Sequence, residues 1–396
     1  MPFLTPFYQT VSPLKTMANS FILTVQGEGR GHLSQALVVY ELLQAQGHLV
    51  TAVIVGSTGS RELPAYFTDK INVPLYRIIS PNFINDRNRK GIHLTKTLIH
   101  AAKSIGKFRR SLSTIKEILE AFKPDAVLNF YEVLTGVYFR LHQPRIPLIS
   151  IAHQYVYFHP EFMFPSGKWL DRFFLKLYTR ITTSSKAKNL GLSFYRLEDI
   201  TARVKVIPPL LRRTIHNSTV ERGDHLLIYL VNPGYFEEVL QWHYEHPQQI
   251  IHCFTDKAEE LKYQYAYDRE TVHVHAPNDT LFVEYMRTAK GLATTAGFES
   301  VCEAMYLGKP VLMVPVAGHF EQFCNSRDAV RAGAGVYASS FSLDKLEAIA
   351  TISHSHHTWF KNWADASRTT LLYEIESTLN ADTIKQPSAN ISLTEG

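Results

Sequence analysis

The segment from Ala293 to Val314 places the tightest constraint on the fold of this chain. A short apolar strand is predicted to stop at Gly297, where a helix begins; the helix ends near Gly308, and Pro310 opens a second apolar run. The turn at Gly297 presents free backbone N–H groups at a helix N-terminus, a position that suits an anionic ligand such as a diphosphate. The segment therefore predicts an α/β unit with an anion site above its strand.

Both halves of the chain repeat this alternation. In the first half, strands are predicted over residues 21–26, 49–55, 75–79, 126–129, 148–151 and 181–183, with a helix over 33–46. In the second half, strands are predicted over 226–231, 249–254, 272–275 and 291–295, with helices after Pro233 and over 280–287. We therefore expect an α/β fold of two doubly wound domains facing each other across a cleft, with ligands beyond the carboxyl ends of the strands.

Two adjacent prolines mark the expected boundary between the domains. Pro208 and Pro209 exclude a continuous helix or a central strand at this point. The predicted units are an N-terminal extension (1–19), a first domain (20–207), a linker (208–223), a second domain (224–357), a closing helix (358–380) and a flexible tail (381–396). Met17, just before the first predicted strand, is an alternative start to Met1.

Composition is that of an ordinary globular protein, with 45% hydrophobic and 19% charged residues. The three cysteines are odd in number and lack C-x-x-C spacing, which argues for a reducing compartment and against structural zinc. No apolar run approaches the roughly 18 residues of a membrane span, and the N-terminus lacks the pattern of a signal peptide. We therefore expect a cytoplasmic protein, with a peripheral position on the inner face of the membrane as an alternative.

Positive charge is concentrated between Asn85 and Lys116, a stretch with nine basic residues and one acidic residue. Apolar residues recur within it at helical spacing. One interpretation is the solvated face of an amphipathic helix, and the other is a surface that meets anionic lipid or an anionic acceptor. No nucleic-acid-binding motif accompanies the charge, so nucleic acid is not an expected partner.

A second glycine-rich loop, Gln26 to His32, follows the first predicted strand. It differs from a dinucleotide-binding fingerprint because His32 replaces the third glycine and no acidic residue ends the second strand, so no nicotinamide cofactor is expected. Gly29 and Gly31 let the backbone approach a ligand closely. With an ordinary pKa of about 6.5, His32 could take a proton from an attacking hydroxyl. Alternatively, His32 caps the helix or fills a polar gap.

Together, the two loops resemble those of inverting glycosyltransferases of the GT-B fold, in which two Rossmann-like domains face a cleft. Similar enzymes are the N-acetylglucosaminyltransferase that forms lipid II and the plant-type UDP-glycosyltransferases. Their N-terminal loop ends in Gly-His, matched here by Gly31-His32. Their C-terminal signature is matched in order and spacing by Gly297, Glu303, Gly308-Lys-Pro310, Glu321-Gln322 and Asn325.

The resemblance implies roles for individual residues. Gly297 would face the donor diphosphate, Glu303 would bind the ribose hydroxyls, and Glu321 and Gln322 would bind the transferred sugar. The further donor-side positions are Asn232, Gly234, Thr295, Phe298, His319 and Asn325. The Asn-Pro pair at Asn232 departs from the family's small Gly/Ser loop. On the acceptor side the expected residues are Gly29, Gly31, His153 and Gln154, with a structural role equally open for His153.

The resemblance also implies a mechanism. Retaining GT-B enzymes carry a glutamate where this chain has Thr295, so a single displacement with inversion is expected, with His32 as the catalytic base. No Asp-x-Asp motif occurs, so no metal is expected. The expected partners are a nucleoside-diphosphate sugar, most simply a UDP-sugar, and an unidentified hydroxyl acceptor. The aromatic loop 155–165 and the basic stretch leave open a lipid-linked acceptor.

Two other functions fit the same fold. Residues 302–304 followed by Leu-Gly-Lys-Pro also resemble the ribose-binding segment of UDP-N-acetylglucosamine 2-epimerases, a class that we group with sugar-nucleotide hydrolases. The third alternative is a non-catalytic protein that binds sugar nucleotides.

Overall fold

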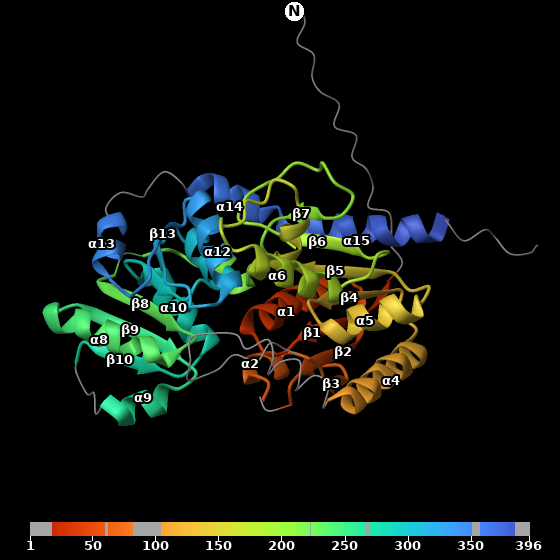
Figure 1. Ribbon diagram of the computed structural model, residues 1–396, viewed down its shortest axis with the longest axis horizontal. Helices are drawn as coiled ribbons and strands as arrows, with labels where there is room; N and C mark the ends of the chain where they lie inside the picture. Colours follow the sequence, from red (N-terminus) through yellow and green to blue (C-terminus); the bar gives the residue numbers. More distant parts are fainter. Residues whose placement is uncertain are drawn as a thin grey trace, which may run out of the picture.

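The computed structural model describes residues 18–59, 62–81, 104–221, 223–265, 270–350 and 357–384. These residues form two parallel sheets with helices packed on both faces of each (Figure 1). The prediction of two doubly wound α/β domains is confirmed. The domain boundaries assigned from the sequence stay a prediction.

The first sheet has seven strands in the order β3-β2-β1-β4-β5-β6-β7. The strands are β1 Ser20–Gln26, β2 Leu49–Ser57, β3 Leu75–Ile79, β4 Ala126–Phe130, β5 Leu148–Ala152, β6 Lys188–Leu192 and β7 Lys205–Ile207. The strand order reverses between β1 and β4, which pair in parallel with Thr24 opposite Asn129. Such a switch point opens a crevice beyond the carboxyl ends of the two strands.

Helices cover both faces of this sheet. They are α1 Arg30–Ala45, α2 Ala65–Thr68, α4 Ile105–Phe122, α5 Val133–His142, the 3-10 helix η1 His153–Phe158 and α6 Trp169–Ile181. Of the basic stretch, residues 85–103 lie outside the described residues. Within α4, Ile115, Ile118 and Leu119 are buried, whereas Lys107 and Lys116 are exposed. This part of the stretch therefore has the form of an amphipathic helix with a solvated basic face.

The second sheet has six strands in the order β10-β9-β8-β11-β12-β13. The strands are β8 His225–Leu230, β9 Ile250–Thr255, β10 Val272–His275, β11 Leu292–Thr294, β12 Val311–Met313 and β13 Gly335–Tyr337. Helix α7 Arg213–His216 lies within the predicted linker. The helices that follow the linker are η2 Pro233–Tyr235, α8 Phe236–Glu245, α9 Ala258–Tyr265, α10 Asp279–Thr288, α11 Phe298–Tyr306, α12 Phe320–Arg331 and α13 Asp344–Ala350. The strand–glycine–helix–strand unit predicted from Ala293 onward is thus β11-α11-β12.

The strand predicted over 181–183 is wrong. The β-branched run Ile-Thr-Thr is typical of a strand, but it forms the end of α6, with Thr182 as the C-cap. The buried Asn129 side chain explains this, because its amide donates to the Thr182 carbonyl at 2.7 Å and holds the helix end against β4. The pattern missed β6 because Lys188, Asn189 and Gly191 interrupt its apolar residues, and it missed β7 because this strand has only three residues before Pro208.

The predicted closing helix is two helices, α14 His357–Asp365 and α15 Ser367–Ile384. The chain returns to the first sheet at this point, because α15 packs on β7 and Glu374 pairs with Lys188 of β6 at 2.7 Å. The extension up to residue 17, including Met17, and the tail beyond residue 384 lie outside the described residues.

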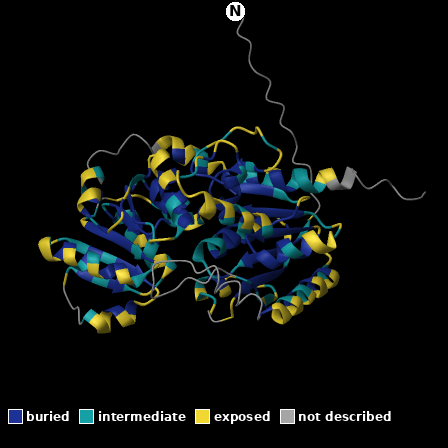
Figure 2. Ribbon diagram, viewed as in Figure 1, coloured by how far each residue is buried: buried dark blue, intermediate teal, exposed yellow. Residues whose placement is uncertain are grey.

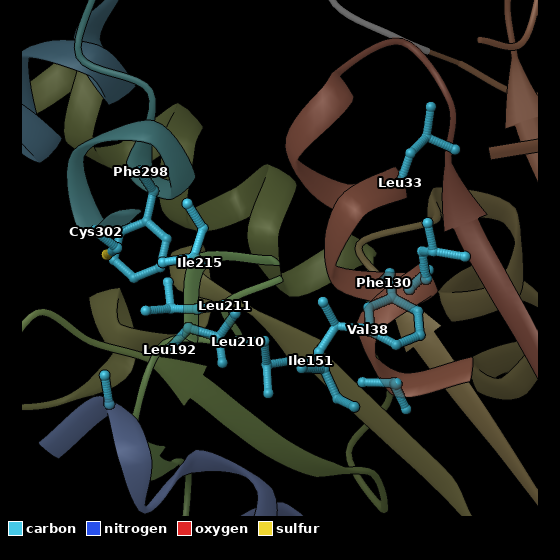
Figure 3. Close-up of a cluster of buried hydrophobic side chains, with 14 of the residues drawn as sticks. Leu33, Val38, Phe130, Ile151, Leu192, Leu210, Leu211, Ile215, Phe298 and Cys302 are labelled. Carbon is cyan, nitrogen blue, oxygen red and sulfur yellow. The ribbon is translucent and has the colours of Figure 1, made fainter. Parts of the chain in front are cut away.

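One apolar core joins the two sheets. It runs from β1 and α1, through the predicted linker, to α11 of the second sheet. Figure 3 shows Leu210, Leu211 and Ile215 between side chains of the first sheet and Phe298 of α11. All three linker side chains are buried, as are most of the strands of both sheets (Figure 2). The linker is therefore part of the core and not a free tether.

Two expectations from composition concern the state of the three cysteines and the absence of a membrane-spanning segment. Cys253, Cys302 and Cys324 are buried free thiols. In the described residues, no helix combines the length and the apolar character needed to cross a bilayer.

A glycine-to-alanine pair tests the packing of α5. A Cβ at Gly136 would lie 2.3 Å from the Thr182 carbonyl carbon and 2.4 Å from the Ile181 oxygen, whereas a Cβ at Gly106 in α4 would meet nothing within 4 Å. Gly136→Ala should lower the free energy of unfolding by about 2 kcal/mol, because the backbone must move apart. Gly106→Ala should leave it unchanged or raise it by up to about 1 kcal/mol. Urea unfolding measures both, and equal effects would contradict the packing.

Candidate active site

A cavity of about 940 Å³ lies between the two sheets. Its walls come from segments that follow the carboxyl ends of strands in both sheets, including the loops after β1, β5, β11 and β12. This is the position expected for a ligand in doubly wound sheets, and the volume suits a ligand of nucleotide size.

Most of the residues predicted for the site line this cavity. From the first sheet they are Gly29, Gly31, His32, His153 and Gln154, and from the second sheet Gly297, Phe298, Glu303, His319, Glu321, Gln322 and Asn325. The two glycine loops, which are more than 250 residues apart in the sequence by their numbers, therefore face the same space.

Three predicted donor positions do not line it. Asn232 accepts a hydrogen bond from the Gly234 N–H at 3.0 Å and starts η2, so it serves the local turn. Thr295 is fully buried behind the cavity wall. A donor role for Asn232, Gly234 or Thr295 stays a prediction.

The N-terminal glycine loop is held against the second sheet. Gly29 caps α1, and Arg30 pairs with Asp256 at 3.0 Å. A Cβ on Gly31 would lie 2.3 Å from a carboxylate oxygen of Glu299, at the start of α11. A side chain at position 31 would therefore have to displace the Glu299 carboxylate from its present position.

His32 is oriented by a chain of two hydrogen bonds. The Gln35 amide nitrogen donates to Glu299, and its oxygen lies 3.3 Å from His32 Nδ1. With the Gln35 oxygen as acceptor, Nδ1–H is the donor, which leaves Nε2 as the unprotonated nitrogen. Tyr131 stacks on the ring with a centroid distance of 5.2 Å. Burial lowers the pKa of His32 against opposing effects of Glu321 and Gln35, so the imidazole is neutral near pH 7 and can accept a proton.

Glu299 was missed by the sequence analysis. Burial, followed by the charges of the neighbouring carboxylates Glu303 and Glu321, raises its pKa to about 7 against hydrogen bonds from its own backbone N–H and from Gln35. Acidic residues are common in the first turn of a helix, so Glu299 carried no functional signal. Only the approach of α1 to α11 places it in the site.

Glu303 forms a two-pronged ion pair with Arg212. Arg212 Nε and Nη2 donate to its two carboxylate oxygens at 2.6 and 2.5 Å, and Nη1 lies 2.8 Å from Asp279. Burial lowers the pKa of Arg212, but the two carboxylates raise it overall. Each oxygen of Glu303 keeps a further lone pair that can accept a ligand hydroxyl. Arg212 was also missed, because it lies in the segment predicted to be a linker.

Side chains of α12 reach the cavity opposite His32. Gln154 donates to Glu321 at 2.8 Å, and the Tyr157 hydroxyl donates to Asn325 at 3.1 Å. His319 caps α12 by accepting from the Gln322 N–H at 3.4 Å. The first contact orients Glu321, which was predicted to bind the transferred sugar, and the second orients Asn325, which was predicted to lie on the donor side.

His153 has the surroundings of a structural residue. Its ring stacks on Phe298 at 4.0 Å, and its Nδ1 lies 2.7 Å from the Leu192 carbonyl oxygen. Burial lowers its pKa to about 4, which makes it a poor base. The geometry favours the structural alternative: His153 holds α11 against β6.

Arg212 gives a test of the ion pair. Arg212→Met leaves Glu303 buried without its partner and should lower the free energy of unfolding by roughly 3–5 kcal/mol. Arg287→Met removes a partly exposed arginine whose partners Glu284 and Glu221 are both exposed to solvent, and should change the free energy of unfolding much less. Chemical denaturation compares the two. The double variant Arg212→Met/Glu303→Leu should recover much of the loss; no recovery would contradict the assignment.

Glu299 gives a test by pH. Its pKa of about 7 lies above the ordinary 4.5, so between these values the folded protein holds a proton that the unfolded chain has released. Stability therefore falls as pH rises through this window, and the loss is complete above about pH 7. The Glu299→Gln variant lacks this pH-dependent loss of stability. The melting temperature of the variant minus that of the unaltered protein should therefore be higher at about pH 8 than at about pH 5.

Calorimetry at the two pH values measures the effect. Glu245→Gln, at an exposed position of α8, is the matched control. A difference that stays constant with pH for Glu299→Gln would contradict the raised pKa.

Comparison with known proteins agrees with this geometry. Residues 20–353 match the family described as Glycosyl transferase family 1, and a comparison with curated proteins gave no match. The crystal structure of the kitacinnamycin glycotransferase has a TM-score of 0.61 at 16% identity, covering 92% of this chain and 100% of that one.

Two plant enzymes crystallised with donor molecules are also similar. Phytolacca americana UGT2, complexed with UDP-2-fluoro-glucose and pterostilbene, has a TM-score of 0.58 at 12% identity and covers 92% of this chain and 100% of its own. Arabidopsis thaliana UGT89C1, complexed with UDP-L-rhamnose, has a TM-score of 0.56 at 16% identity and covers 93% and 99%. Because the family match spans most of the sequence and the fold is shared, the chain belongs to glycosyl transferase family 1 and is a GT-B glycosyltransferase.

Proposed function

We propose that this enzyme moves a sugar from a nucleoside-diphosphate sugar, most simply a UDP-sugar, to a hydroxyl acceptor, with inversion and without a metal ion. The observation that carries the proposal is the shared cavity. It joins a neutral histidine from the first sheet to the N-terminus of α11 and the Glu303 carboxylate from the second.

The second sheet provides features that suit the donor. The first turn of α11, whose N–H groups have no partner within the helix, lines the cavity from Gly297 onward and suits a diphosphate. Glu303, fixed by Arg212, suits the ribose hydroxyls, and Glu321 with Gln322 suits the hydroxyls of the transferred sugar. The UDP-sugars bound by the two similar plant enzymes support uridine as the nucleoside.

The reaction is a single displacement. The acceptor hydroxyl gives its proton to Nε2 of His32 while its oxygen bonds to the anomeric carbon. The bond from that carbon to the diphosphate oxygen breaks, and the nucleoside diphosphate leaves with the electron pair. Backbone N–H groups at the start of α11 stabilise the charge that develops on the leaving group.

Inversion is supported by the position of Thr295. A retaining pattern would place a glutamate there, and this side chain is instead a buried threonine away from the cavity. Family membership favours a transferase over an epimerase, a hydrolase or a non-catalytic binding protein. Epimerisation of UDP-sugars, or release of free sugar from them without an acceptor, would favour the epimerase or hydrolase alternative.

His32→Ala tests the assignment of the base. Transfer should fall about a hundredfold or more, because the acceptor hydroxyl loses its proton acceptor. The rise in melting temperature caused by UDP should stay unchanged, since His32 does not hold the donor. In the unaltered enzyme, kcat/KM should fall only at a pH below the ordinary imidazole value of about 6.5, because burial lowers the pKa of His32, and the variant should lack this limb.

UDP release from UDP-glucose or UDP-rhamnose, with pterostilbene and long-chain alcohols as acceptors, provides the assay. His142→Ala, at an exposed position of α5, is the control. Near-normal turnover by His32→Ala would remove His32 as the base. A product with the anomeric configuration of the donor, seen by NMR, would overturn inversion.

A further inference from the structure

Helix α6 turns a stripe of large apolar side chains toward solvent. Trp169, Leu170, Phe173 and Leu177 are 72, 50, 56 and 40% exposed. Their spacing of three or four residues places them on one face of the helix. Elsewhere in the described residues, exposed large apolar side chains occur no more than one to a helix or strand. A contiguous patch of this kind marks an interaction surface.

The other side of α6 is already used by the fold. Leu175 and Thr179 are buried, and Phe174, Leu175 and Tyr178 line the cavity. The helix packs against η1, α5 and α12, and Figure 1 shows it beside α12. Helix α6 therefore has two apolar faces: one packs against the protein, and the other, the exposed stripe, faces solvent.

A basic stripe runs beside the apolar one. Lys168, Arg172, Lys176 and Arg180 are four residues apart, so the first three directly precede Trp169, Phe173 and Leu177 of the neighbouring stripe; Lys168 also lines the cavity. Asp171 is the only acidic residue between 168 and 181. Among the described residues, none of the four cations forms an ion pair.

The cations are held close to one another despite their mutual repulsion. Arg172 and Lys176 both lie over the Phe164 ring, at 4.6 and 5.0 Å from its centroid. Burial lowers the pKa of Lys176, and the charges of Arg172, Arg203 and Arg180 lower it further. Uncompensated positive charge at this density attracts a surface of negative charge.

We propose that this surface of α6, the apolar stripe with the basic stripe beside it, docks on a bilayer that contains anionic lipid. Aromatic and leucine side chains enter the boundary between head groups and acyl chains, while the cations meet the lipid phosphates. The match of an apolar stripe to acyl chains and of free cations to anionic head groups favours this occupant over a protein partner. The same helix then supplies the docking surface and one wall of the cavity.

This proposal concerns binding and does not depend on the reaction. It also differs from the sequence-based expectation for residues 85–116, because α6 combines exposed aromatic groups with free cations, whereas in α4 Lys116 pairs with Glu120.

The test is co-sedimentation with vesicles at low salt. The full chain should bind vesicles of equal parts phosphatidylcholine and phosphatidylserine, and bind pure phosphatidylcholine weakly. Trp169→Gln/Phe173→Gln should reduce binding about tenfold or more through loss of the inserted rings. Arg172→Gln/Arg180→Gln should reduce it and weaken its dependence on salt.

The matched control is Tyr244→Gln/Tyr263→Gln, which removes two exposed aromatic groups from the second half of the molecule. It should bind as the unaltered protein does. Melting temperatures and the shift caused by UDP establish that each variant is folded. Absence of binding, equal binding to both vesicles, or equal losses in the α6 and control variants would overturn the proposal. So would self-association in solution that disappears only in the α6 variants.

Discussion

The buried apolar side chains of the linker hold the two sheets together. Leu210, Leu211 and Ile215 are buried between the first sheet and α11. Without this packing the sheets would be two separate units, and the cavity would have one wall. Because apolar burial is favourable and without direction, the core draws the halves together, and polar contacts then set their register.

Those polar contacts lie at the site itself. Glu299 lies against Gly31 and accepts a hydrogen bond from Gln35, whose oxygen is hydrogen-bonded to His32. Arg212 of the linker forms an ion pair with Glu303. The group proposed to take the proton is therefore oriented by the half of the molecule proposed to bind the donor. Because the pKa of the Glu299 carboxyl in this contact is raised to about 7, the stability that the contact contributes depends on pH.

Much of the fold was predictable because apolar periodicity reports burial. The strand over 75–79 matches β3, and β1, β2, β4 and β5 were placed within two residues at each end. Prediction failed where tertiary contacts outweighed local preference. The Ile-Thr-Thr run at 181 ends a helix because Asn129 binds its backbone, and polar β6 is a strand because it pairs with β5. Among the site residues, the sequence analysis predicted most of those that belong to a recognisable motif. It missed Glu299 and Arg212, because neither belongs to one.

Short patterns in the sequence were enough to predict two doubly wound α/β domains, both glycine loops and the residues of the transferase signature, because each of these depends on a few neighbouring residues. The tertiary structure decided which of these residues meet. It paired Arg212 with Glu303, placed Glu299 beside Gly31, left Asn232 and Thr295 off the cavity, and turned the apolar and basic stripes of α6 outward. These outcomes depend on how two distant halves pack, and such packing is a sum of many weak contacts that local spacing does not record.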